Sequence, residues 1–255
     1  MENLTHYPVL VFVAAFVSLS LASAAGARLR RRYPSVSDER NEHLSVILAA
    51  TLTLLALIIG FSFSMATNRY DQRKNFEEAE ANAIGTEILR ADLLPPADAA
   101  SVRKLLGDYL DQRIVFYVNK DDAQRTQIDE RISQLEVDLW AAVRGPAAAQ
   151  PTPVAALVLA GMNDVINSQG YTQAAYWNRI PTAAWCLMAA IALCSNVLFG
   201  YRARNAGKLA LVLPLVVSIS FLLIADIDAP RHGLIHVSPQ NLESLARSLG
   251  HSNSS

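Results

Sequence analysis

The sequence predicts an all-α integral membrane protein, in which four transmembrane helices form two hairpins that flank a helical extramembrane insert. Of its 255 residues, 52% are hydrophobic and only 18% are charged, which is too apolar for an ordinary soluble protein. Four uncharged apolar runs stand out, at residues 9–27, 44–67, 180–201 and 209–225. Each would reach roughly 26 to 36 Å as a helix, against a hydrocarbon core of about 30 Å.

The first run, residues 9–27, is interpreted as a retained membrane anchor. A signal peptide is the alternative, because the small residues in LASAAGA would suit a cleavage site. A signal peptide, however, carries positive charge before its apolar region, whereas here Glu2 and His6 precede the run and four arginines follow it. We therefore assign residues 1–67 to the first transmembrane hairpin, with the N-terminus outside the cytoplasm.

The second hairpin covers residues 180–228, and the hydrophilic insert, residues 68–179, separates it from the first. The short connections within the hairpins, RLRRRYPSVSDERNEH and RARNAGK, are both basic. Because positively charged loops favour the cytoplasm, this pattern predicts that the insert and both termini lie on the non-cytoplasmic side. Arginines at the opposite ends of the second and third runs counteract this preference.

The insert is predicted to be mostly helical. The second apolar run continues into it through many good helix formers, so one helix should leave the membrane and end near Pro95 and Pro96. Asp98 or Ser101 would then cap the next helix.

Two further segments complete the insert, and a polar tail, residues 229–255, ends the chain. Leucine and isoleucine recur at four-three-four spacing in a helix that should end at Gly145 and Pro146, and this stripe requires a partner helix in the chain or in a second copy. Residues 153–168 are too short for a confident span. They are predicted to form an amphipathic helix at the membrane surface or against the insert.

The segment GFSFSMATNRYDQRKNFEEAEANAIG, residues 60–85, changes within one helical turn from uncharged to densely charged. Such a change indicates a helix that emerges from the membrane into water, and two interpretations are open for it. In one, Arg69 is a juxtamembrane anchor whose charge reaches the headgroups. In the other, a ring of arginines forms a pore mouth that attracts anions, and Thr53, Leu57 and Phe61, spaced by four, line a constriction.

The candidate residues of this mouth or juxtamembrane charge cluster are Arg69, Asp71, Glu80, Asp226, Asp228 and Arg231. Asp226 follows an apolar run of about 26 Å, so it should lie near the edge of the hydrocarbon layer. An acidic side chain there requires a partner, which Arg231, Arg69 or Arg179 would supply. Glu80 is expected to form an exposed ion pair that contributes a few tenths of a kcal/mol, roughly.

A metal site is an alternative use of the same region. Asp226, Asp228, His232 and His236 offer oxygen and nitrogen ligands for a divalent cation. A proline and a glycine between them break the helix that would align the histidines, and no zinc-type spacing results. A structural cap or salt-bridge cluster is therefore favoured, and we predict neither a metal nor a cofactor.

Other function classes have no support in the sequence. It contains no phosphate-binding glycine loop, nucleophile elbow or zinc-type His-Glu spacing, so no enzymatic activity is predicted. A net charge of −1 and an insert without a basic stripe give no reason to expect nucleic acid. The expected partners are the lipid bilayer, further copies of the chain and small inorganic ions.

Five segments resemble one family of membrane proteins: GFSFSMATNRYDQRKNFEEAEANAIGTEILRADLLP, NDVIN, RIPTAAW, LFGY and ADIDAPRHGLIHVS. Together they are similar to a mostly bacterial family of integral membrane proteins described as bestrophin-like. The resemblance covers nearly the whole chain and implies location in a bacterial inner membrane.

The resemblance also implies a function. True bestrophins are pentameric anion channels whose second membrane helix carries Gly-Phe and, nine positions after that Gly, Arg and an aromatic residue. Gly60, Phe61, Arg69 and Tyr70 match this arrangement. The implied function is an oligomeric ion channel or transport-related pore lined by the second transmembrane helix. The alternative is a non-conducting structural or sensory protein whose insert binds a partner.

Overall fold

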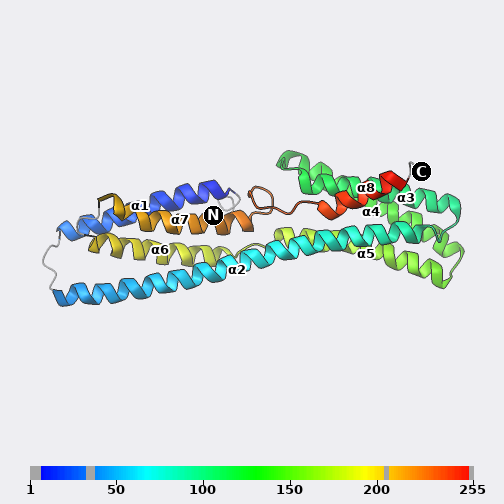
Figure 1. The fold of residues 1–255 in the computed structure, drawn as a ribbon. Coiled ribbons are helices and arrows are strands. Elements are labelled where there is room, and N and C mark those ends of the chain that lie inside the picture. Colours follow the sequence, from blue (N-terminus) through cyan, green and yellow to red (C-terminus); the bar gives the residue numbers. More distant parts are fainter. Residues whose placement is uncertain (1–6, 33–37, 204–206, 253–255) are drawn as a thin grey trace. The chain divides into compact units, whose positions relative to one another are not determined.

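The computed structural model describes residues 7–32, 38–203 and 207–252, and every regular element in these ranges is a helix (Figure 1). This confirms the predicted all-α class. The α-helices and one short 3-10 helix are α1 (Pro8–Arg32), α2 (Asp38–Ala91), α3 (Pro96–Val118), α4 (Asp122–Ala149), α5 (Pro153–Trp177), α6 (Thr182–Arg202), η1 (Gly207–Leu211), α7 (Val212–Asp228) and α8 (Gln240–Ser252).

The chain divides into two compact units. The membrane unit comprises Met1–Tyr70 and Arg179–His236, and the insert unit comprises Asp71–Asn178 and Val237–Ser255. Within the described residues, four helical stretches are long and apolar enough to cross a bilayer: Pro8–Arg32, Asn41–Ala91, Pro153–Arg202 and Gly207–Asp228. These stretches contain the four predicted runs and confirm the four transmembrane helices.

In the membrane unit, α1 packs along α6 and α7, so helices from both hairpins share one apolar core. At the crossing of α1 and α6 the backbones touch. A Cβ atom added at Gly26 would overlap the carbonyl oxygen of Val197, and one added at Gly200 would overlap that of Ser23. Close approach through small residues is a common way to join helices in a bilayer, where apolar surface alone provides little attraction between them.

In the insert unit, other helices cover one face of the part of α2 that follows Asp71. In it, α3 packs against α4, α4 against α5, and α8 against α3. Glu77 of α2 holds the start of α8, because its carboxylate accepts the backbone N–H groups of Asn241 and Leu242 at 2.9 and 3.0 Å. A carboxylate at a helix N-terminus satisfies N–H groups that have no partner within the helix.

Two predicted helix boundaries are wrong. Helix α3 starts earlier than the predicted caps, at Pro96, because proline at the first position needs no N–H partner; neither Asp98 nor Ser101 is its cap. Helix α4 runs through Pro146 to Ala149. The proline lies in the last turn, where alanines follow it and Ala147 is buried, so the helix continues for one more turn.

The continuous helix at the membrane exit is confirmed, since α2 runs unbroken to Ala91. The segment predicted at residues 153–168 begins a longer helix, α5. The Thr152 hydroxyl accepts the N–H of Ala155 at 3.1 Å, and Val158 and Met162 are buried as α5 packs against α4. The structure therefore shows this helix packed against another helix of the insert, which is one of its two predicted locations.

Candidate functional site

The predicted pore-lining residues lie together on one face of α2. Thr53, Leu57 and Phe61 are all exposed, and the exposed fractions of Leu57 and Phe61 are 54% and 63%. The Thr53 hydroxyl donates to the carbonyl oxygen of Ala49, one turn earlier, at 2.9 Å. Its polarity is therefore satisfied within the helix, and the face presents a threonine methyl, a leucine and a phenylalanine.

The opposite face of α2 belongs to the core of the membrane unit. Leu55, Ser62 and Ala66 are at most 2% exposed. A helix with one face so deeply buried has a fixed rotation about its axis. The exposed stripe of Thr53 and Phe61 is therefore presented in a defined direction, away from the rest of this chain.

Asp228, at the end of α7, is the centre of a charge cluster. Its side chain is buried, and its two oxygens accept the backbone N–H of Ile180 at 3.1 and 3.2 Å. The guanidinium groups of Arg69 and Arg179 lie 3.7 and 3.6 Å from the same carboxylate. This one aspartate thus joins α2, the segment before α6 and α7 within the membrane unit.

Asp226 has different partners from those predicted. Its carboxylate accepts the backbone N–H groups of Leu234 and Ile235 at 2.7 and 2.9 Å. Of the three arginines predicted to neutralise it, Arg231, Arg69 and Arg179, the last two lie at Asp228, and the chain turns back after α7 to bring two N–H groups to the Asp226 carboxylate.

The turn after α7 holds the other charged candidates. Arg231 is partly buried within it, and the rings of His232 and Tyr7 lie edge to face with their centres 5.1 Å apart. In the part of the chain that the structure describes, no three His, Cys, Asp or Glu side chains are arranged to hold a metal. The two aspartates and two histidines of the alternative metal site are not brought together as a set of ligands among these residues, and both carboxylates accept backbone N–H groups.

Asp71 and Glu80 belong to the insert unit, and their environments differ. Asp71 is exposed, as predicted for the charged segment. Glu80 is fully buried, so the prediction of an exposed ion pair is wrong. The reason is that helices α3 and α5 cover this face of α2 and supply its partners.

Those partners form a buried network around Glu80. Arg113, also fully buried, donates to both carboxylate oxygens, with 3.1 Å from Nη2 to Oε2. The Tyr117 hydroxyl and the Thr172 hydroxyl donate to the same oxygen at 3.2 and 3.1 Å. Burial, followed by the charge of Glu80, raises the pKa of Tyr117, which keeps its phenol protonated as a donor.

A further buried acid of α2, Glu87, lies two turns beyond Glu80. Its carboxylate oxygens have no hydrogen-bond partner among the described residues, and Arg90 lies 3.8 Å away. Burial raises the pKa of Glu87 to about 7, while the charge of Arg90 acts in the opposite direction. The sequence contains one indication that these acids are buried, because Glu77, Glu80 and Glu87 lie on the same helical face as the apolar Ile84.

These features define an all-helical integral membrane protein whose second span continues as one helix into an extramembrane helical unit. The chain belongs to the bestrophin-like family: the profile of the bestrophin-like domain matches residues 10–242. This confirms the family indicated by the sequence segments.

Solved structures support the same fold. Three crystal structures of a bacterial bestrophin homolog from Klebsiella pneumoniae, each with a different single mutation, are similar to this chain. They have TM-scores of 0.65, 0.66 and 0.65 at 12%, 12% and 13% identity. The similarity covers 96% of this chain and 99%, 97% and 99% of those chains. No curated protein matches the chain.

Proposed function

We propose that the protein is an ion-conducting pore, assembled from several copies of the chain and lined by the exposed face of α2. The observation that carries this proposal is the stripe of Thr53, Leu57 and Phe61, which is exposed while the opposite face of α2 is buried. Copies arranged around an axis would turn this stripe inward and form an apolar constriction, one of the ways in which channels gate. Membership of the bestrophin-like family supports the same function.

The permeant ions in this proposal are small anions. The guanidinium groups of Arg69 and Arg179 both lie beside the single carboxylate of Asp228, so one positive charge remains in this cluster. Arg69 lies about 80° around the helix from Phe61, so it acts through its electrostatic potential and not as part of the constriction. The reversal potential in asymmetric chloride checks this preference: a cation-selective current would contradict it.

Phe61→Ala is expected to raise the single-channel current at least about twofold, because the largest side chain of the constriction is removed. The measurement is current across a planar bilayer containing purified protein. Phe63→Ala is the matched control, since Phe63 is also exposed on α2 but faces α7. An equal effect of both variants would contradict the assignment of the pore face.

A second candidate function is a non-conducting protein whose insert binds a partner. One observation favours it, an open hollow of about 470 Å³ on the surface of α4 beside the exposed Val137. Its lining residues are Thr126, Asp129, Glu130, Ser133, Gln134 and Val137. Absence of current from folded protein in the same bilayers would favour this function over the pore.

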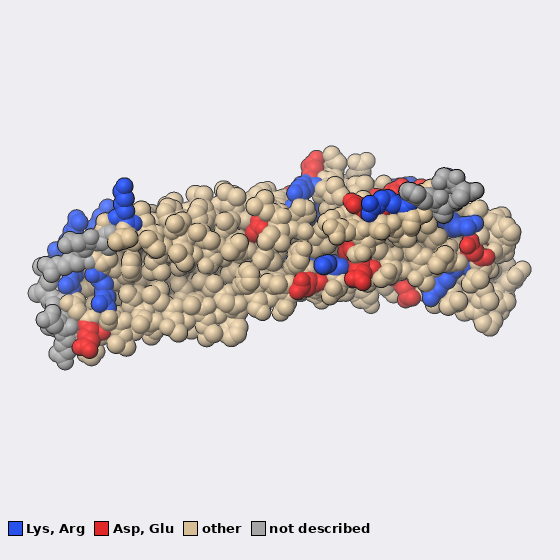
Figure 2. Space-filling model, viewed as in Figure 1, with Lys and Arg blue, Asp and Glu red and all other residues tan. Residues whose placement is uncertain are grey.

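We propose the orientation that follows from the basic loops, with the insert and both termini outside the cytoplasm of a bacterial inner membrane. On the face shown in Figure 2, Lys and Arg gather at one end of the membrane unit, next to a broad band without charge. A reporter that is active only in the cytoplasm, fused within the insert, should be inactive. Activity would reverse the orientation without affecting the pore proposal.

A further inference from the structure

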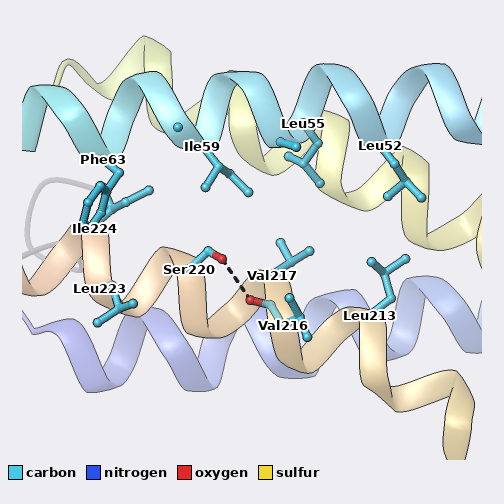
Figure 3. A pocket seen from close by; sticks show the side chains of 12 residues that line it. Leu52, Leu55, Ile59, Phe63, Leu213, Val216, Val217, Ser220, Leu223 and Ile224 are labelled. Atoms are coloured by element: carbon cyan, nitrogen blue, oxygen red, sulfur yellow. Dashed lines mark hydrogen bonds between the residues drawn. The ribbon is translucent and has the colours of Figure 1, made fainter.

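An apolar groove lies between α2 and α7 in the membrane unit (Figure 3). Its volume is about 410 Å³, and its lining residues are Leu52, Leu55, Ala56, Ile59, Gly60, Phe63, Leu213, Val216, Val217, Ser220, Leu223 and Ile224. The hydroxyl of Ser220 donates to the carbonyl oxygen of Val216 at 3.1 Å, so the polar side chain in the lining is satisfied within α7. The groove is therefore lined by apolar side chains and by one serine whose hydroxyl proton is already donated, which suits a hydrocarbon.

Gly60 shows that this space is not filled by the chain itself. A Cβ atom added at Gly60 would meet no atom within 4 Å, although the residue lies in the middle of a membrane-spanning helix. Glycine inside a helix is destabilising relative to alanine. At this position the absence of a side chain widens the groove.

The length of the groove is close to that of one acyl chain. From Leu52 to Phe63, α2 rises about 16 Å, and half of a hydrocarbon core is about 15 Å. The apolar run of α2 begins at residue 44, about 12 Å before Leu52, so a lipid at the basic end places the terminal half of an acyl chain in the groove.

One end of the groove leads to basic side chains. Arg202 donates to the hydroxyl of Ser45, which precedes Leu52 on α2 by about 10 Å. Lys208 is exposed on η1, five residues before Leu213 on the other wall. Figure 2 shows Lys and Arg collected at this end of the membrane unit.

We propose that the groove holds an acyl chain of an anionic phospholipid, whose phosphate lies near Arg202 and Lys208. The apolar lining accounts for the chain, and the basic end accounts for the charge of the headgroup. A zwitterionic lipid with the same chains fits the groove equally well but carries no net charge for the basic end. The binding is independent of whether the pore conducts, and it is tested without any current measurement.

The test is native mass spectrometry of the full-length protein, purified in detergent and stripped of lipid. Phosphatidylglycerol and phosphatidylcholine with identical chains are added separately. Wild type should bind phosphatidylglycerol about tenfold more tightly, as two nearby cations predict. The double variant Arg202→Gln/Lys208→Gln should bind both lipids equally.

Filling the groove separates the site from general lipid adhesion. Gly60→Leu is expected to lower the binding of both lipids at least about tenfold, because its side chain occupies the space of the acyl chain. Ser220→Leu fills the groove from α7 and should act in the same way, which covers the case in which one variant fails to fold. Gly107→Leu is the matched control, since a Cβ atom at Gly107 also meets no atom within 4 Å but lies in the insert unit.

Two results would overturn the proposal. Wild-type lipid binding by folded Gly60→Leu and Ser220→Leu would place the lipid elsewhere. A change in the oligomeric mass of these variants with lipid binding unchanged would show that a second copy of the chain occupies the groove.

Discussion

Arg113→Met is expected to lower the free energy of unfolding by about 3 to 5 kcal/mol, because it leaves the buried carboxylate of Glu80 without its cation. Both side chains are fully buried, and Tyr117 and Thr172 are neutral donors that cannot balance the remaining charge. The guanidinium carbon of Arg113 also lies 4.4 Å from the centre of the Phe116 ring, a contact that methionine replaces only in part. Chemical denaturation of full-length protein in detergent, followed by helical circular dichroism, measures the loss.

Two control variants separate a buried ion pair from general damage. Arg103→Met removes the ion pair with Asp92, in which the two side chains are 49% and 53% exposed, and should cost less than about 1 kcal/mol. The double variant Glu80→Gln/Arg113→Met should recover part of the stability, since no buried charge remains unpaired. If Arg113→Met lowered the free energy of unfolding no more than Arg103→Met does, the Glu80 carboxylate would be in contact with water, which would contradict the buried ion pair.

Gly200→Leu is expected to destabilise the membrane unit by about 3 kcal/mol, at the upper end of the cost of overpacking. The Cβ atom of the added leucine would overlap the carbonyl group of Ser23. These are backbone atoms, which cannot move aside as the end of a flexible side chain can. Helix α1 would have to move away from α6, which would open the core that both hairpins share.

Gly60→Leu is the matched control for this crossing. It is the same substitution in the same unit, at a position where an added Cβ atom meets no atom within 4 Å. Thermal unfolding in detergent should show a lower melting temperature for Gly200→Leu and no lowering for Gly60→Leu. Equal melting temperatures would mean that α1 and α6 do not touch at this crossing.

The four membrane helices were predictable because the signal that defines them is local. A bilayer requires long uncharged runs, and each run is visible without knowledge of its neighbours. The continuation of α2 was predictable for a similar reason, since no proline interrupts it before Pro95. The predicted stripe of Thr53 and Phe61 is exposed. Exposure alone does not distinguish a helix face that contacts lipid from one that lines water, so the role of this stripe in a pore stays a prediction.

The buried charges were not predictable from local pattern. The hydrogen-bond partners of Glu80 lie 33, 37 and 92 residues further along the chain, at Arg113, Tyr117 and Thr172. A glutamate among other charges is usually exposed, and only the packing of α3 and α5 over α2 places this one inside. The close approach of α1 and α6, at Gly26 against Val197 and at Gly200 against Ser23, depends in the same way on packing between helices distant in sequence.

The central claim, that α2 lines an ion-conducting pore, is tested most directly by whether a thiol reagent at residue 57 blocks the current. The background is Cys186→Ala/Cys194→Ala, because both native cysteines are exposed. A small water-soluble thiol reagent should abolish the chloride current of Leu57→Cys and leave that of Leu55→Cys unchanged, since Leu55 is buried on the opposite face. A current that persists after complete modification of Leu57→Cys would contradict the claim.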